Sequence, residues 1–322
     1  MEKIVNLSPL PKEFLIELFK MNGVEDIEVV DAGNFDEKQV IESVRNAGYI
    51  IGDYRFQQKI TREVAQAARN VKLIQQPSVG YQHIDIGACS EAGIKVANTA
   101  GANTIAAAEH TIMTALCLIK NIFYAVRTTA AGEWWQMEVR PVELFNKTWG
   151  FIGFGRIGKA VAERLIAFGI RMLYYDITRI TAEEEKRLQV TFADLSDVLK
   201  SSDILSLHCP LTEQTTGLIN RDNIALMKPE AIVINVARGE VIDEQALAEA
   251  LRDGKLGGAA LDVFSGEPID AKNPLLAVAG DKVILSPHVA GVSQEAQGRI
   301  LTTTITNIVK FMKGQTLESF VN

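Results

Sequence analysis

Several features that mark whole classes of protein are absent from this sequence. It has only three cysteines in 322 residues, and their spacing matches neither a disulfide framework nor a metal or redox motif. No apolar run reaches the roughly 18 residues that a membrane-spanning helix needs, and the chain opens without a signal-peptide core. We therefore expect no metal ion, no membrane partner and a cytoplasmic location.

An excess of positive charge is absent as well. The net charge is −7 at pH 7 and the pI is near 5.3, which disfavours nucleic acid as a partner. At 322 residues, the chain exceeds the size at which a single hydrophobic core keeps growing, and 47% of its residues are apolar. The sequence therefore predicts two globular domains.

The most informative feature that is present is the glycine-rich turn at 153–158, which reads Gly-Phe-Gly-Arg-Ile-Gly. An apolar run at 149–152 predicts a buried strand before it, and an amphipathic run predicts a helix after it. Gly153 would make the tight turn, Gly155 would let the backbone approach a pyrophosphate, and Gly158 would let the helix pack closely on the strand. The pyrophosphate of a dinucleotide would then lie on the unpaired amides of the helix N-terminus.

An acidic residue, Asp176, ends the next apolar run and completes a pattern of strand, turn, helix, strand and acid. Its carboxylate would accept hydrogen bonds from the ribose hydroxyls of an adenosine and would repel a 2′-phosphate. The pattern therefore predicts a binding site for NAD rather than NADP.

The rest of the chain alternates short apolar runs with amphipathic stretches, a pattern typical of parallel βα units. The expected fold class is α/β, with two Rossmann-like or flavodoxin-like domains, each built on a parallel sheet, and a cleft between them. One long helix is predicted over 103–127, which has no internal proline or glycine, and another over 293–313. The predicted strands are 3–7, 27–30, 49–51, 72–75 and 95–97, and then 149–152, 172–175, 203–207, 231–235, 259–263 and 283–285.

Three further residues follow predicted strands, which is where open parallel sheets bind ligands. The planar guanidinium of Arg238 could hold a carboxylate through two parallel hydrogen bonds, or it could be a surface arginine beside a turn glycine. A lone histidine such as His288 is more often a hydrogen-bonded structural residue, but a carboxylate held against it would favour the protonated imidazole and fix its tautomer. His288 would then be an acid and base, whereas we expect His83 in a solvated loop, His110 packed in a helix and His208 at a strand end.

In this order, the motifs resemble those of the D-isomer-specific 2-hydroxyacid dehydrogenases, over essentially the whole chain. The likeness includes residues 78–85, 108–110 and 207–212. It implies an NAD-dependent oxidoreductase that interconverts a D-2-hydroxy acid and its 2-oxo acid. It also implies a discontinuous substrate-binding domain, 1–99 plus 290–322, and an NAD-binding domain, 100–289.

The resemblance also implies a role for individual residues. Arg238 binds the substrate carboxylate and polarises the carbonyl, His288 is the acid and base, and Glu267 assists it. The backbone amides of Val79 and Gly80 hold the carboxylate from the other domain. The implied cofactor-binding residues are Gly153, Gly155, Arg156, Ile157, Gly158, Asp176, Pro210, Val236, Ala237, Arg238, Asp262, which would meet the nicotinamide amide, His288 and Gly291.

Aromatic residues at the position of Trp134 and Trp135 can cover the active site of a neighbouring subunit in such enzymes, which implies a homodimer. The partners are otherwise expected to be small 2-hydroxy and 2-oxo acids.

Some alternatives stay open. One is a binding protein that senses NAD, like the transcriptional corepressors that resemble this family, although the complete set of catalytic residues favours an enzyme. Another is an enzyme like formate dehydrogenase, which has glutamine where Glu267 stands, or like phosphite dehydrogenase, which has a lysine in the loop of Ser78 and Val79. The candidate substrates are 3-phosphoglycerate, hydroxypyruvate and glyoxylate. Arg55 could meet a distal phosphate or could simply be solvated.

From Asp176 we expect at least a tenfold preference for NADH over NADPH, about 1.4 kcal/mol, because the 2′-phosphate loses ribose hydrogen bonds and meets a like charge. Steady-state kcat/KM with each cofactor measures the preference. Asp176→Asn should narrow the gap, and equal values for the unchanged protein would contradict the assignment.

Overall fold

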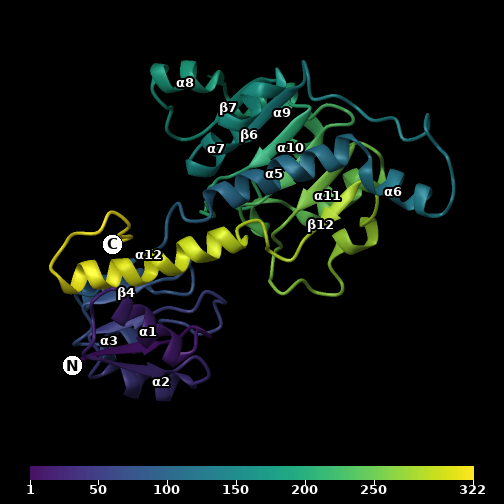
Figure 1. Ribbon diagram of the computed structural model, residues 1–322. Coiled ribbons are helices and arrows are strands. Elements are labelled where there is room, and N and C mark those ends of the chain that lie inside the picture. The colour runs from purple at the N-terminus through teal and green to yellow at the C-terminus, as the bar shows by residue number, and fades with distance from the viewer. The chain divides into compact units, whose positions relative to one another are not determined.

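Two compact units make up the chain in the computed structural model, which describes residues 1–322. Unit 1 comprises Met1–Asn103 and Gln294–Asn322, and unit 2 comprises Thr104–Ser293. Each unit has its own β-sheet, in which all strands run parallel (Figure 1). The predicted α/β fold with two parallel sheets is confirmed.

Unit 1 is built on a five-stranded sheet of order β2-β1-β3-β4-β5, with apolar residues packed on both faces. The last helix of the chain returns to this unit and packs beside β4, where Ile305 and Ile308 are buried (Figure 1). The strands are β1 (Glu2–Asn6), β2 (Ile27–Asp31), β3 (Tyr49–Ile51), β4 (Leu73–Gln75) and β5 (Lys95–Ala97), and the helices are α1 (Lys12–Met21), α2 (Glu37–Val44), α3 (Arg62–Ala67), α4 (Ile86–Glu91) and α12 (Gln294–Met312).

Unit 2 is built on a seven-stranded sheet of order β12-β11-β10-β9-β6-β7-β8. The strands are β6 (Thr148–Ile152), β7 (Arg171–Tyr175), β8 (Val190–Phe192), β9 (Ile204–Leu207), β10 (Ile232–Asn235), β11 (Gly258–Leu261) and β12 (Val283–Leu285). Every residue of β6, β9, β10 and β11 is buried, as expected where helices cover both faces.

The strand order of unit 2 changes direction at β6, since β7 lies on one side of it and β9 on the other. Ligands of open parallel sheets bind at such a switch point, beyond the carboxyl ends of the strands. The helices that surround the sheet are α5 (Thr104–Ile119), α6 (Ile122–Ala130), α7 (Arg156–Leu165), α8 (Ala182–Leu188), α9 (Leu195–Ser201), α10 (Arg221–Leu226) and α11 (Glu244–Arg252), with short 3-10 segments η1 (Ile166–Phe168), η2 (Gly239–Val241) and η3 (Pro274–Val278).

The prediction of one uninterrupted helix over 103–127 was wrong. Asn121 has a left-handed backbone with φ of +49°, which ends α5 and begins α6 at an angle of 59°. Asparagine tolerates this region better than most residues, and its Nδ2 donates to Val139 O at 2.7 Å. No single helix here has the length and apolarity to span a membrane, although the bent pair α5 and α6 could by length and composition alone.

One strand, β8, escaped the sequence prediction. It has three residues, pairs only with β7 at the edge of the sheet, and follows a left-handed Gln189. A segment this short shows no periodicity in its sequence. It is a strand only because it pairs with β7.

Candidate active site

The glycine-rich turn joins β6 to α7 in unit 2. Gly153 has φ of +83°, and a Cβ added to it would lie 2.4 Å from the amide nitrogen of Cys209. A Cβ on Gly158 would lie 2.9 Å from Gly153 O, so the helix packs directly on the turn. A Cβ on Gly155, in contrast, would meet no atom within 4 Å. The turn is therefore closed towards the sheet and open to a ligand on its outer side.

The first turn of α7 supplies donors at this open side. Its first helical hydrogen bond runs from Lys159 N to Gly155 O, so the preceding amides of Arg156 and Ile157 have no carbonyl within the helix. The ten-residue helix adds the positive end of its dipole. An anionic pyrophosphate fits such a cradle.

Asp176 follows β7 and is held against the same turn. Its Oδ2 accepts a hydrogen bond from Phe154 N at 2.6 Å, and its Oδ1 accepts one from Thr178 N at 3.1 Å. An ionised carboxylate has about four lone-pair sites, so two are left for the hydroxyls of a ribose. Together with the cradle, this arrangement fits a dinucleotide.

His208 and Pro210 belong to the segment after β9, where the backbone of Cys209 touches Gly153. Burial lowers the pKa of His208 to about 3, and its Nε2 lies 3.0 Å from Ser206 Oγ. The ring is therefore neutral at working pH and cannot act as a general acid. Pro210 follows directly, beside the glycine-rich turn.

Arg238 follows β10 in a turn shaped by Asn235. The Asn235 side chain accepts from Ala237 N at 3.0 Å and donates to Arg238 O at 2.9 Å. The Arg238 guanidinium donates to Ala237 O at 2.6 Å. Burial lowers the pKa of this guanidinium, against the opposing charges of Glu267 and Glu240, but an arginine remains a cation at neutral pH.

Gly239 sets the spacing between the Arg238 turn and the loop that follows β11. A Cβ on Gly239 would lie 1.9 Å from the carbonyl carbon of Phe264 and 2.2 Å from Ser265 N. No side chain fits between these two backbones. In the second loop, Phe264 N donates to Glu267 Oε1 at 3.1 Å, which holds the glutamate in place.

Glu267 and His288 form a direct pair, with Nδ1 of the imidazole 2.7 Å from Oε2 of the carboxylate. Burial raises the pKa of Glu267, but the hydrogen bonds from His288 and Phe264 and the charge of Arg238 outweigh it, so the pKa lies below its usual value. An ionised carboxylate only accepts, so Nδ1 carries the proton and Nε2 is left for a substrate.

Asp262 holds the loop that carries His288. This carboxylate is 1% exposed; its Oδ1 accepts from Val289 N at 2.9 Å and from the Ser286 hydroxyl at 2.5 Å, and its Oδ2 accepts from Ala290 N at 2.7 Å. His288 between these anchors has a left-handed backbone with φ of +54°, a conformation that needs such support. No sequence pattern indicates this anchoring role, because it depends on a loop after another strand.

His110, on α5, joins the same cluster. Its Nε2 lies 3.4 Å from Ser286 Oγ and 3.9 Å from Asp262 Oδ1. Ser286 gives its one hydroxyl hydrogen to Asp262, so His110 is the donor towards Ser286. Burial lowers the pKa of His110, which agrees with a packed neutral ring.

Unit 2 thus brings together Arg238, Glu267 and His288 at the carboxyl ends of β10, β11 and β12, with Val236 and Ala237 in the Arg238 turn and Gly291 just beyond His288. Val79 and Gly80 belong to unit 1, in the loop after β4.

His83 follows that loop and differs from its prediction. Both of its ring nitrogens are buried without a hydrogen-bond partner, and its ring lies 4.7 Å from that of Phe56, centroid to centroid. Burial lowers the pKa of His83 to about 4, against the charge of Asp53. The expected solvated histidine is therefore a packed, neutral one, because Phe56 covers it.

The comparisons with known proteins all indicate the same family. Residues 112–290 match the family model described as D-isomer specific 2-hydroxyacid dehydrogenase, NAD binding domain. A glyoxylate reductase of Thermofilum pendens is 41% identical over 82% of this chain and 78% of its own length. A D-3-phosphoglycerate dehydrogenase of Archaeoglobus fulgidus is 37% identical over 99% of this chain, which spans only 59% of that relative. The crystal structure of D-lactate dehydrogenase from Aquifex aeolicus, complexed with NAD and lactic acid, is similar with a TM-score of 0.85 and 30% identity, over 99% of each chain.

Proposed function

The chain belongs to the D-isomer-specific 2-hydroxyacid dehydrogenase family, and on that premise we propose that it is an NAD-dependent oxidoreductase that interconverts a D-2-hydroxy acid and its 2-oxo acid. The observation that carries the proposal is the Glu267–His288 pair, 2.7 Å apart, on the sheet that also carries the dinucleotide cradle and Arg238. A protein that only sensed NAD would have no need of a charged acid–base pair beside an arginine.

The reduction needs a hydride at the carbonyl carbon and a proton at the carbonyl oxygen. The reduced nicotinamide, when bound, supplies the hydride. Arg238 binds the substrate carboxylate and stabilises the negative charge that gathers on the carbonyl oxygen. His288 Nε2 donates the proton, and the Glu267 carboxylate stabilises the imidazolium before transfer and orients the ring afterwards. In the oxidation, the neutral Nε2 removes the hydroxyl proton.

We assign cofactor binding to unit 2, which also carries Arg238, and the remaining substrate-binding groups to unit 1. The amides of Arg156 and Ile157 would hold the pyrophosphate and Asp176 the ribose, while the amides of Val79 and Gly80 would bind the substrate carboxylate. Asp262 has its oxygens engaged with the His288 loop, so it would contact nicotinamide only through a remaining lone pair. The remaining residues assigned to the cofactor are Gly153, Gly155, Gly158, Pro210, Val236, Ala237 and Gly291.

The substrate is one of three candidates: glyoxylate, hydroxypyruvate or 3-phosphoglycerate. Arg55, which could favour a phosphorylated acid, has its Nε 3.3 Å from Asp53 Oδ1, and its side chain is 32% exposed. The buried Asp53 compensates part of the charge of Arg55, which argues for the two smaller acids. A phosphate would need the other guanidinium nitrogens.

A panel of 2-oxo acids tests the proposed function. NADH oxidation should be measurable with at least one of the three acids or, for phosphoglycerate, with the corresponding 2-oxo acid. Arg238→Ala should lose both kcat and affinity for the acid, since one guanidinium serves the carboxylate and the oxyanion, while NADH binding by fluorescence should change little. Arg221→Ala, an exposed arginine of the same unit paired with Glu249, is the matched control. A panel without any turnover would reject the dehydrogenase.

The pH dependence should report the Glu267–His288 pair. The pKa of Glu267 lies below its usual value, so this carboxylate stays ionised around neutral pH, 2.7 Å from Nδ1 of His288. Reduction needs the imidazolium and should fall as pH rises, whereas oxidation needs the neutral ring. Glu267→Gln removes the charge, so both pH limbs should move to lower pH.

Profiles of kcat/KM in both directions, for the unchanged protein and for Glu267→Gln, measure this shift. His288→Ala should cost at least about 10²-fold in kcat. Superimposable profiles of the two proteins would leave Glu267 with a purely structural role.

We also propose a homodimer formed through the segment after α6. Trp134, Trp135 and Met137 are 85%, 43% and 80% exposed, which is unusual for large apolar side chains. A second copy of this chain would cover them. Sedimentation velocity should show a dimer, and the double variant Trp134→Ala, Trp135→Ala should shift it towards monomer; a monomeric unchanged protein would contradict the assignment.

A further inference from the structure

The loop of Ser78, Val79 and Gly80 in unit 1 has an unusual distribution of hydrogen bonds. All three of its carbonyls have donors: Ser78 O accepts from Thr99 N at 3.2 Å, Val79 O from Asn98 Nδ2 at 2.8 Å, and Gly80 O from Ser78 Oγ at 2.8 Å. The amides of Val79 and Gly80 have no partner within the chain. The carbonyls are thus held inward, and the amides are available to an anion.

A series of hydrogen bonds between polar groups, which we call the polar chain, reaches this loop from the residue that directly follows β4. Gln76 follows β4 and is fully buried, and its Nε2 donates to Asp53 O at 3.2 Å and to Ser78 Oγ at 2.7 Å. Both amide hydrogens of Gln76 are therefore used. Ser78 Oγ accepts from Gln76, so its own hydrogen goes to Gly80 O. The donor and the acceptor of each hydrogen bond in the polar chain are therefore fixed.

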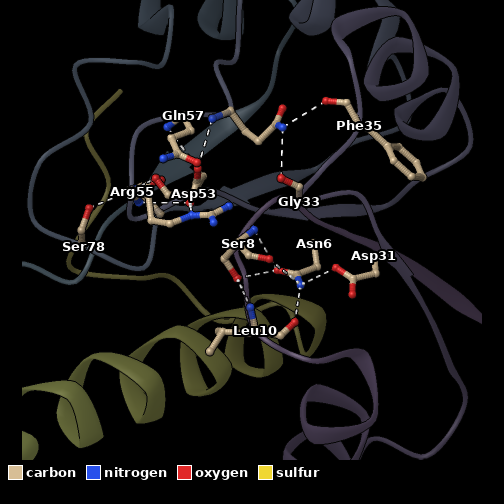
Figure 2. Close-up of polar contacts among 12 residues, drawn as sticks. Asn6, Ser8, Leu10, Asp31, Gly33, Phe35, Asp53, Arg55, Gln57 and Ser78 are labelled. Carbon is tan, nitrogen blue, oxygen red and sulfur yellow. Dashed lines mark hydrogen bonds and ion pairs between the residues drawn. The ribbon is translucent and has the colours of Figure 1, made fainter. Parts of the chain in front are cut away.

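The two ends of this polar chain are fixed in different ways. Gln76 lies against Gly52, where a Cβ would be 2.1 Å from Gln76 Oε1, so its side chain occupies the space that the absent side chain of Gly52 leaves. The side chain of Asp53, 0% exposed, accepts from Arg55 N, Gln57 N and Gln58 N at 3.0, 3.1 and 3.1 Å, which holds the backbone that accepts from Gln76 (Figure 2).

From these contacts we infer that Gln76 is a positioning residue for substrate binding: through Ser78 it fixes the Gly80 carbonyl and thereby directs the Val79 and Gly80 amides towards the substrate carboxylate. The inference rests on the proposed function, in which those amides bind that carboxylate. Gln76 itself touches neither substrate nor cofactor. Its loss should weaken binding of the acid and leave binding of NADH, in unit 2, unchanged.

The test compares Gln76→Met, which keeps the length of the side chain without its donors, with Ser78→Ala and with the double variant. The probe is oxamate, a 2-oxo acid analogue that is not reduced, titrated into the complex of each protein with NADH by calorimetry. Each single variant should raise the Kd of oxamate, and the KM of the accepted 2-oxo acid, about fivefold, the effect of one hydrogen bond. The double variant should have a Kd for oxamate no higher than that of the weaker-binding single variant, because both substitutions interrupt the same series of hydrogen bonds.

Ser8→Ala is the matched control, since Ser8 is a buried serine that also follows a strand of the same sheet. Its hydroxyl donates to Asn6 Oδ1 at 2.6 Å in a separate cluster (Figure 2). It should lower the Tm as much as Ser78→Ala does and leave the Kd of oxamate within about a factor of two.

Two outcomes would overturn the inference: an unchanged Kd of oxamate in Gln76→Met, or effects of Gln76→Met and Ser78→Ala that multiply in the double variant. Either would leave the proposed function intact as long as Arg238→Ala still loses activity. Failure of the unchanged protein to reduce any 2-oxo acid would instead reject the function itself.

Discussion

The buried carboxylate of Asp262 is the interaction on which the chemistry of unit 2 depends. At the end of β11 it gathers three donors from the loop after β12 and so holds a histidine in a backbone conformation that few residues adopt unaided. A few residues beyond Asp262, in the loop after β11, Phe264 N fixes Glu267. One strand end therefore determines where both Glu267 and His288 lie.

The charges of the site follow from this geometry. Arg238 is positive and Glu267 is negative, so the proton that the proposed reduction requires on His288 would give the group one net positive charge. A monocarboxylate substrate balances it. In the proposed reduction, transfer of the proton from His288 to the new hydroxyl would leave these three protein groups neutral in sum.

Sequence patterns anticipated the parts of this molecule that have local causes. Gly153 and Gly158 could be recognised because a tight turn and a close helix contact each exclude a side chain, and the central strands because they are apolar throughout. The break at Asn121, the packed ring of His83 and the anchoring by Asp262 depend on Val139, Phe56 and Ser286, which are distant in sequence or unmarked by any motif. The inferred role of Gln76 could not be predicted from the sequence for the same reason, since it depends on which groups accept hydrogen bonds from its side chain.

The contact at Gly239 has a consequence for how this active site can change. Because the backbones of the Arg238 turn and the Phe264 loop touch with no room for a Cβ, no residue larger than glycine can stand at 239 without moving one of them. Since Phe264 N holds Glu267, a larger residue at 239 would also shift the carboxylate that pairs with His288.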